Sequence, residues 1–86
     1  MASYELVFRK SVAKDLRAFL KKDVKRIMQR LMALADDPRP MGCEKLSGQE
    51  RYRIRQGDYR VIYEIQDASL IVLVVKVANR RDVYRA

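Results

Sequence analysis

Arginine side chains are concentrated in the second half of the chain, and their spacing there suits chemistry on an anion. Arg53 and Arg55 alternate with their neighbours, and Arg60 follows shortly afterwards. Guanidinium groups bind phosphate oxygens through paired hydrogen bonds and keep their charge at physiological pH. Held beside a phosphate, they stabilise the extra negative charge of a phosphorane without a metal ion. These residues are therefore suited to binding phosphate. Where a 2′-hydroxyl can attack that phosphate, they are also suited to RNA cleavage.

The composition of the whole chain agrees with a polyanionic partner. Its 86 residues include 19 Lys+Arg against 11 Asp+Glu, which gives a formal net charge of +8. Such a surface attracts nucleic acid ahead of anionic membranes or acidic proteins. The absence of His and the single Cys43 exclude a Cys-His zinc site, an intrachain disulfide and imidazole catalysis. Without a signal-like or membrane-spanning segment, we expect one cytoplasmic domain over residues 1–86 that uses no metal or cofactor.

The first half of the chain predicts a strand followed by two helices. Residues 3–9 alternate in hydropathy with the period of a strand. Apolar residues recur at helical spacing after Ser11, the expected N-cap, and again from Asp23. The second helix is expected to end at Asp37-Pro38, because proline disfavours a helical conformation in the residue before it. Prolines and glycines in residues 38–49 predict a loop that returns the chain to the sheet.

The second half predicts three strands. Residues 51–56 and 59–65 are rich in strand-forming residues, and Gly57-Asp58 between them suits a two-residue hairpin turn. Residues 70–77 are apolar apart from Lys76, as expected for a strand that is covered on both faces or lies centrally in the sheet. The predicted fold class is therefore α+β, with a small, mostly antiparallel sheet of about four strands packed against an N-terminal helical hairpin. Its order is β-α-α-β-β-β, followed by a short C-terminal helical turn.

The hairpin turn determines which side chains share a face of the predicted sheet. Counting outward from Gly57-Asp58 places Arg55 opposite Arg60 and Arg53 opposite Ile62. The other face is apolar and consists of Tyr52, Ile54, Val61, Tyr63 and Ile65. Three guanidinium groups in adjacent positions repel one another, and this repulsion favours binding of an anion. The alternative is an ordinary solvated face, on which acidic residues such as Glu64 and Asp82 pair with the arginines.

The C-terminal segment adds an aromatic ring. If the chain makes one helical turn after the last strand, Arg80 and Tyr84 lie on the same side. Arginine forks on phosphates and a ring that stacks on a base are typical of single-stranded nucleic-acid binding.

In three segments the sequence resembles the RelE branch of the RelE/ParE superfamily of toxins. The segments are Tyr52-Arg53-Ile54-Arg55, Gly57-Asp58-Tyr59-Arg60-Val61-Ile62-Tyr63 and Val77-Ala78-Asn79-Arg80-Arg81-Asp82-Val83-Tyr84-Arg85. The resemblance covers essentially the whole chain and implies a RelE-like fold. It also implies a ribosome-dependent endoribonuclease, an mRNA interferase that cuts mRNA in the A site and inhibits translation. A cognate acidic, RelB-like antitoxin would neutralise it in a toxin–antitoxin hetero-oligomer.

The resemblance also implies roles for individual residues. The catalytic positions are Arg53, Arg55, Arg60, Arg80 and Tyr84. Arg60 is assigned to the scissile phosphate, Arg80 to the phosphate or the leaving oxygen, and the other arginines to transition-state charge. Some members of the family have lysine at positions 53 and 55, but arginine does not give up a proton, so Tyr84 is the remaining candidate for the general base. Peripheral RNA contacts are expected at Lys45, Arg51, Lys76 and Arg81.

Two other functions stay open. A ParE-type toxin would poison DNA gyrase by binding a protein, and that branch lacks the complete set formed by Arg60, Arg80 and Tyr84. A basic nucleic-acid-binding module without catalytic activity is the other alternative. No helix-turn-helix, zinc-finger or RNP-type aromatic motif supports such a module.

Overall fold

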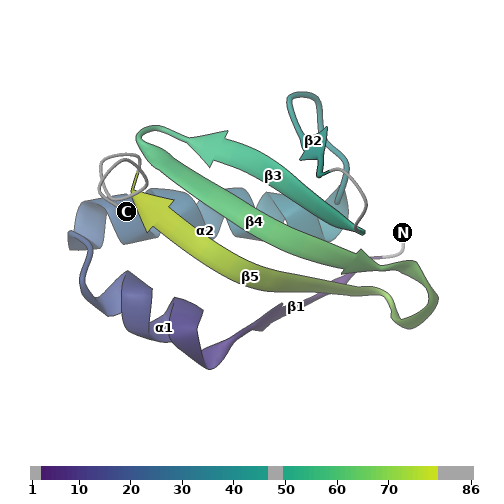
Figure 1. The fold of residues 1–86 in the computed structure, drawn as a ribbon, viewed down its shortest axis with the longest axis horizontal. Helices are drawn as coiled ribbons and strands as arrows, with labels where there is room; N and C mark the ends of the chain where they lie inside the picture. The colour runs from purple at the N-terminus through teal and green to yellow at the C-terminus, as the bar shows by residue number, and fades with distance from the viewer. Residues whose placement is uncertain (1–2, 47–49, 80–86) are drawn as a thin grey trace.

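The computed structural model describes residues 3–46 and 50–79, which fold into a sheet and two helices (Figure 1). The elements are β1 (Glu5–Phe8), α1 (Lys10–Arg17), α2 (Lys21–Asp36), β2 (Glu44–Lys45), β3 (Arg51–Gln56), β4 (Tyr59–Gln66), a 3-10 turn η1 (Asp67–Ser69) and β5 (Ile71–Asn79). In Figure 1, α2 runs behind the sheet and α1 lies beside β5. The predicted α+β class, with a helical hairpin against a mostly antiparallel sheet, is confirmed.

The sheet has the strand order β1-β5-β4-β3-β2. Its pairs are antiparallel except for β1 and β5, which run parallel from Glu5 opposite Ile71 to Phe8 opposite Val74. The strand near residues 70–77 is β5, which lies inside the sheet between β1 and β4, next to the central strand β4. A register shift between Ile62 and Tyr63 marks a bulge in the pairing of β4 with β5.

The β3–β4 hairpin has the register that the turn residues predict. Gln56 pairs with Tyr59, and Arg55 pairs with Arg60. Gly57 has a φ of +60°, a conformation that costs glycine little and other residues more. Glycine at the first central position is typical of a turn whose twist matches that of the two strands. The turn therefore determines which side chains of the hairpin face the helices.

The core lies between the helices and one face of the sheet. Burial alternates strictly along β4, where every second side chain is buried. Val12 and Ile27 are fully buried on the two helices, and Tyr63 is fully buried in the centre of the sheet. The predicted apolar face is confirmed, since all five of its members are buried: Tyr52, Ile54, Val61, Tyr63 and Ile65. The arginine-bearing side chains of the hairpin consequently point away from the core.

The ends of the helices differ from the prediction. The N-cap of α1 is Arg9 and not Ser11, which lies inside the helix. The backbone N–H of Arg9 still bonds to the carbonyl of Val74 at 3.2 Å, so the helix begins directly where strand pairing ends. Similarly, α2 begins at Lys21 and not at Asp23. The helix α1 starts directly after the pairing with β5, and α2 starts directly after the short connection from α1. Neither helix has a side-chain hydrogen bond at its N-cap.

The loop predicted over residues 38–49 contains a further short strand. Glu44 and Lys45 form β2, which pairs with Arg53 and Tyr52 of β3. The sheet therefore has five strands where about four were expected. A two-residue strand leaves no periodic signal in a sequence, because only its partner strand defines it. The predicted C-terminal helical turn lies outside the described residues.

Leu70 offers a test of backbone strain in the turn that precedes β5. It has a φ of 54° and a ψ of 49°, and 43% of its surface is exposed. A left-handed conformation costs non-glycine residues about 1–2 kcal/mol, whereas asparagine adopts it more readily. We expect Leu70→Asn to raise the free energy of unfolding by about 1 kcal/mol in urea denaturation. Leu70→Ala, which removes the side chain but keeps the strain, is the control and should show no increase.

Candidate functional site

Four arginines form an open surface on the β3–β4 hairpin, which we call the arginine face: Arg51, Arg53, Arg55 and Arg60. The first three alternate along β3, and Arg60 lies opposite Arg55 on β4. Because residues directly opposite each other share a face of the sheet, the predicted clustering of guanidinium groups is present. Arg55 is exposed, and the other three are partly buried, as expected when long side chains lie along a sheet.

Some of the basic residues predicted to contact RNA form ion pairs with acidic residues. Arg53 is ion-paired with Glu44 of the neighbouring strand β2. Outside the arginine face, Lys76 contacts Asp15 of α1 at 3.1 Å. Lys45 lies 3.6 Å from Glu50. The lysines expected to contact RNA are therefore engaged in exposed ion pairs, which contribute little to stability and open at small cost.

Arg55 and Arg60 differ from these residues. Across residues 3–46 and 50–79, neither guanidinium has a hydrogen bond or an ion pair with another side chain. The two side chains flank a shallow depression beside the hairpin turn, which Gly57, Asp58 and Tyr59 also line. Two cations directly opposite each other repel, and a bound anion relieves that repulsion. This pair is the part of the arginine face best suited to hold a phosphate.

Tyr59 fixes the end of the hairpin that carries this pair. Its side chain is buried, and its ring centroid lies 4.8 Å from that of Phe19. The Tyr59 hydroxyl donates a hydrogen bond of 2.8 Å to Asp23 at the start of α2. Burial, and then the hydrogen bond to Asp23, raise the pKa of Tyr59, so the hydroxyl stays protonated at neutral pH. The neighbouring Arg60 thus projects from a strand end that is attached to α2 and to the connection between the two helices.

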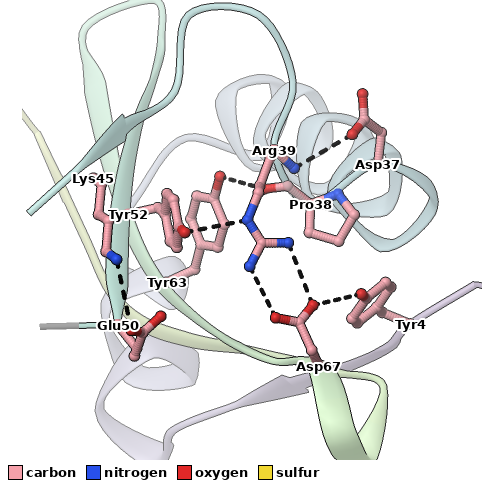
Figure 2. Close-up of polar contacts among 9 residues, drawn as sticks. All are labelled: Tyr4, Asp37, Pro38, Arg39, Lys45, Glu50, Tyr52, Tyr63 and Asp67. Carbon is pink, nitrogen blue, oxygen red and sulfur yellow. Dashed lines mark hydrogen bonds and ion pairs between the residues drawn. The ribbon is translucent and has the colours of Figure 1, made fainter.

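Arg39 anchors the connector between α2 and β2, close to the end of α2 (Figure 2). Its guanidinium forms two hydrogen bonds to the Asp67 carboxylate, at 2.9 and 3.3 Å, and its Nε donates to the Tyr52 oxygen at 3.1 Å. The Tyr4 hydroxyl donates to the same carboxylate at 2.7 Å. These contacts join the connector, the residue before β1, the strand β3 and the turn after β4, and we refer to them as the Arg39 clamp.

A buried hydrogen bond holds the connector just before the clamp. The hydroxyl of Tyr63 donates to the backbone carbonyl of Pro38 at 2.7 Å (Figure 2). Burial, followed by its interaction with Cys43, raises the pKa of Tyr63. The connector is therefore fixed at both Pro38 and Arg39, and this attachment directs β2, with Glu44, toward Arg53.

Acid is expected to weaken the Arg39 clamp. The hydrogen bond from Arg39, and then that from Tyr4, lower the pKa of Asp67 from its usual value of 3.8. A carboxyl with a lowered pKa in the folded state stabilises the fold above its unfolded pKa, and this contribution disappears as the pH falls through the folded pKa. We expect the difference in unfolding free energy between the wild type and Asp67→Asn to shrink below about pH 4. Urea denaturation between neutral pH and about pH 3 measures it, and a constant difference would contradict the clamp.

Several predicted site residues lie outside the part of the chain that the structure describes, namely Arg80, Arg81 and Tyr84. The last described residue, Asn79, pairs with Tyr59 at the end of the sheet that carries Arg55 and Arg60. Within the described ranges, no group of three or more acidic, cysteine or histidine side chains is arranged to hold a metal ion. No helix in those ranges is long and apolar enough to cross a membrane.

Sequence reasoning missed the contacts that shape the surroundings of the arginine face. Arg39, Asp67 and Glu44 were not singled out, because their partners are distant in sequence or belong to a strand without a periodic pattern. Proline on both sides of Arg39 is the one local signal that this residue occupies a fixed position in the connector.

Comparison with known protein families identifies the chain as a toxin of the RelE/ParE superfamily. Residues 6–84 match the family described as ParE toxin of type II toxin-antitoxin system, parDE, and the chain belongs to this family. No curated protein sequence gives a significant match. The resemblance to the RelE/ParE superfamily is therefore confirmed over nearly the whole chain.

Solved structures similar to this chain include RelE toxins. RelE in the RelE–RelB complex of Pyrococcus horikoshii OT3 has a TM-score of 0.79 and 27% identity, over 91% of this chain and 96% of that chain. The isolated Escherichia coli RelE toxin has a TM-score of 0.80 and 26% identity, over 96% and 93% of the two chains. The RelBE2 complex of Mycobacterium tuberculosis has a TM-score of 0.81 at 21% identity, over 91% and 99%, and supports the fold.

Proposed function

We propose that this type II toxin is a metal-independent endoribonuclease that cleaves mRNA in the A site of the ribosome. One observation carries the proposal: Arg55 and Arg60 lie directly opposite each other on an open sheet face, without a side-chain partner among the described residues. A surface of this kind suits a phosphodiester, and the similarity to RelE structures favours the RNase branch.

The reaction proceeds by attack of the 2′-hydroxyl on the adjacent phosphate, with departure of the 5′-oxygen of the next nucleotide. A 2′,3′-cyclic phosphate and a free 5′-hydroxyl result. Arg60 binds the scissile phosphate, while Arg53 and Arg55 stabilise the charge that develops on the phosphorane. Arg80 stabilises negative charge on the phosphate or on the leaving oxygen, and Tyr84 is the candidate for proton transfer. Because the sequence contains no histidine to act as the base, we expect the ribosome to supply the alignment of the 2′-hydroxyl with its phosphate.

A translation reaction without DNA gyrase tests this proposal. We expect addition of the toxin to stop protein synthesis and to produce mRNA cuts at a fixed position within codons, mapped by primer extension. Naked RNA should be nearly inert under the same conditions, because it lacks the proximity and orientation that a bound complex supplies. These effects can lower the activation barrier by up to about 7–11 kcal/mol. Equally fast cleavage of naked RNA would overturn the dependence on the ribosome.

Poisoning of DNA gyrase is the second candidate function, because the description of the matching family names the ParE toxin. In that case the purified protein should inhibit gyrase supercoiling in a reaction that contains no ribosomes. Translation should then continue in its presence, and the mRNA should remain intact. The two assays give opposite results for the two functions, so together they decide between them.

An acidic antitoxin is the partner that we propose for regulation. The net charge of +8 favours an acidic segment, and the RelE of P. horikoshii OT3 was solved in complex with RelB. A partly disordered acidic segment that folds on binding can cover both basic and apolar surface. We expect the antitoxin to abolish cleavage and its affinity to fall with rising salt. Inhibition by a segment that contacts neither the arginine face nor the C-terminal residues would contradict this mode of neutralisation.

A further inference from the structure

A second depression adjoins the arginine face at the edge of β3. It has a volume of about 390 Å³ and is lined by Arg30, Gly42, Glu44, Arg53, Ile54 and Arg55. Two of its lining residues, Arg53 and Arg55, also belong to the arginine face. The depression is thus continuous with the surface on which we place the scissile phosphate, and a strand of RNA that crosses this surface can reach it.

Arg30 lines this depression from a different element, the helix α2. Its Nε atom is buried and has no hydrogen-bond partner within residues 3–46 and 50–79. A buried donor of a charged group that lacks an acceptor is costly, and such groups are rare in folded proteins. Arg30 therefore has hydrogen-bonding capacity that the fold does not use, although nothing in the proposed cleavage mechanism involves it.

Among the residues that the structure describes, Glu44 is the one acidic residue that lines the depression. Its carboxylate is ion-paired with Arg53, and 66% of its side chain is exposed. An exposed pair of this kind breaks at little cost. Glu44 thus neutralises part of the positive charge in the free protein, and it can move into solvent when a stronger anion arrives.

We propose that this depression is a second phosphate subsite, in which Arg30 binds the phosphodiester next to the scissile one and Glu44 competes with that phosphate for Arg53. The inference rests on the proposed RNA cleavage and adds a binding residue to it. A nucleic acid is favoured as the occupant because the depression shares Arg53 and Arg55 with the arginine face, so that one strand contacts both. Three arginines from two elements also suit a phosphate, which accepts hydrogen bonds from several directions.

Binding of a non-cleavable 2′-deoxy tetranucleotide tests the subsite without requiring catalysis. We expect a saturable shift of the Arg30 Nε–H resonance in NMR titrations, and a roughly tenfold weaker affinity for Arg30→Gln. Loss of one phosphate contact should reduce the slope of log K against log salt by about 0.7. Glu44→Gln should instead bind several-fold more tightly. Lys25→Gln, which removes one exposed positive charge from the same helix, is the matched control and should bind like the wild type.

Cleavage on the ribosome then places the contact within the substrate. An mRNA with an uncharged methylphosphonate next to the scissile phosphate should react about tenfold more slowly with the wild type. With Arg30→Gln, the same replacement should have no further effect, because the contact is already absent. If the wild type cleaves no mRNA on ribosomes, the proposed function fails, whereas the tetranucleotide titration still decides whether the subsite exists.

Two outcomes would overturn the subsite. One is wild-type affinity and an unchanged salt slope for a folded Arg30→Gln. The other is normal tetranucleotide binding combined with weakened antitoxin binding, which would assign the depression to an acidic peptide. If Arg30→Gln does not fold, as judged by its thermal unfolding, Arg30→Lys replaces it. That variant keeps the charge, so the salt slope should persist while the affinity falls, and an unchanged affinity would count against the subsite.

Discussion

The Arg60→Ala variant is expected to cleave ribosome-bound mRNA about 100- to 1000-fold more slowly than the wild type, since loss of one preorganised donor to a developing oxyanion costs about 3 kcal/mol. Arg60 lies opposite Arg55 on a strand end that Tyr59 attaches to α2. Its charge is therefore already in position when negative charge grows on the phosphate. Single-turnover cleavage at saturating toxin measures this effect.

Binding to the ribosome should respond much less to the same substitution. We expect many basic residues to share the proposed contact with ribosomal RNA, so that each contributes a small part of the affinity. Arg17→Ala removes an exposed arginine of α1 and serves as the matched control, with cleavage close to that of the wild type. If Arg60→Ala cleaves at the wild-type rate, the proposed catalytic arginines are wrong, and the gyrase alternative gains support.

Substitutions of Tyr84 are expected to separate proton transfer from base stacking. A positioned general acid or base contributes about 100- to 10,000-fold to the rate. Tyr84→Ala removes both the hydroxyl and the ring, so we expect a loss within that range. Tyr84→Phe keeps a ring that stacks on a base but has no proton to transfer, and it should be impaired less than the alanine variant.

The pH dependence of single-turnover cleavage distinguishes the two roles of Tyr84. If the phenol transfers a proton, the rate of the wild type should rise with pH until the phenol is ionised, and Tyr84→Phe should lose this rise. If the ring only stacks, Tyr84→Phe should follow the wild type at every pH. That result would leave charge stabilisation by the arginines as the principal source of the rate.

The β3–β4 hairpin shows what the sequence alone could predict. Its register follows from Gly57-Asp58, because a two-residue turn leaves one way of pairing the strands and side chains then alternate between the faces. The clustering of Arg53, Arg55 and Arg60 was therefore predictable from local information. The apolar face was predictable for the same reason.

The short strand β2 and the Arg39 clamp show why other features were not predictable. Glu44 and Lys45 become a strand only because β3 lies beside them. Arg39 meets Asp67 across 28 positions of the chain, and no periodic pattern relates two residues so far apart. The partial neutralisation of Arg53 by Glu44 depends on both features, so the sequence indicated a more open cationic surface than the structure has.

The position of β5 between β1 and β4 determines how late in synthesis the sheet of this toxin can form. The chain is translated from β1 onward, yet β1 has no strand to pair with until residues 71–74 have been made. Before that point β4 also lacks its neighbour on one side, so the sheet can contain only β4, β3 and the short β2. Interrupted translation before β5 therefore yields a fragment that cannot complete its sheet.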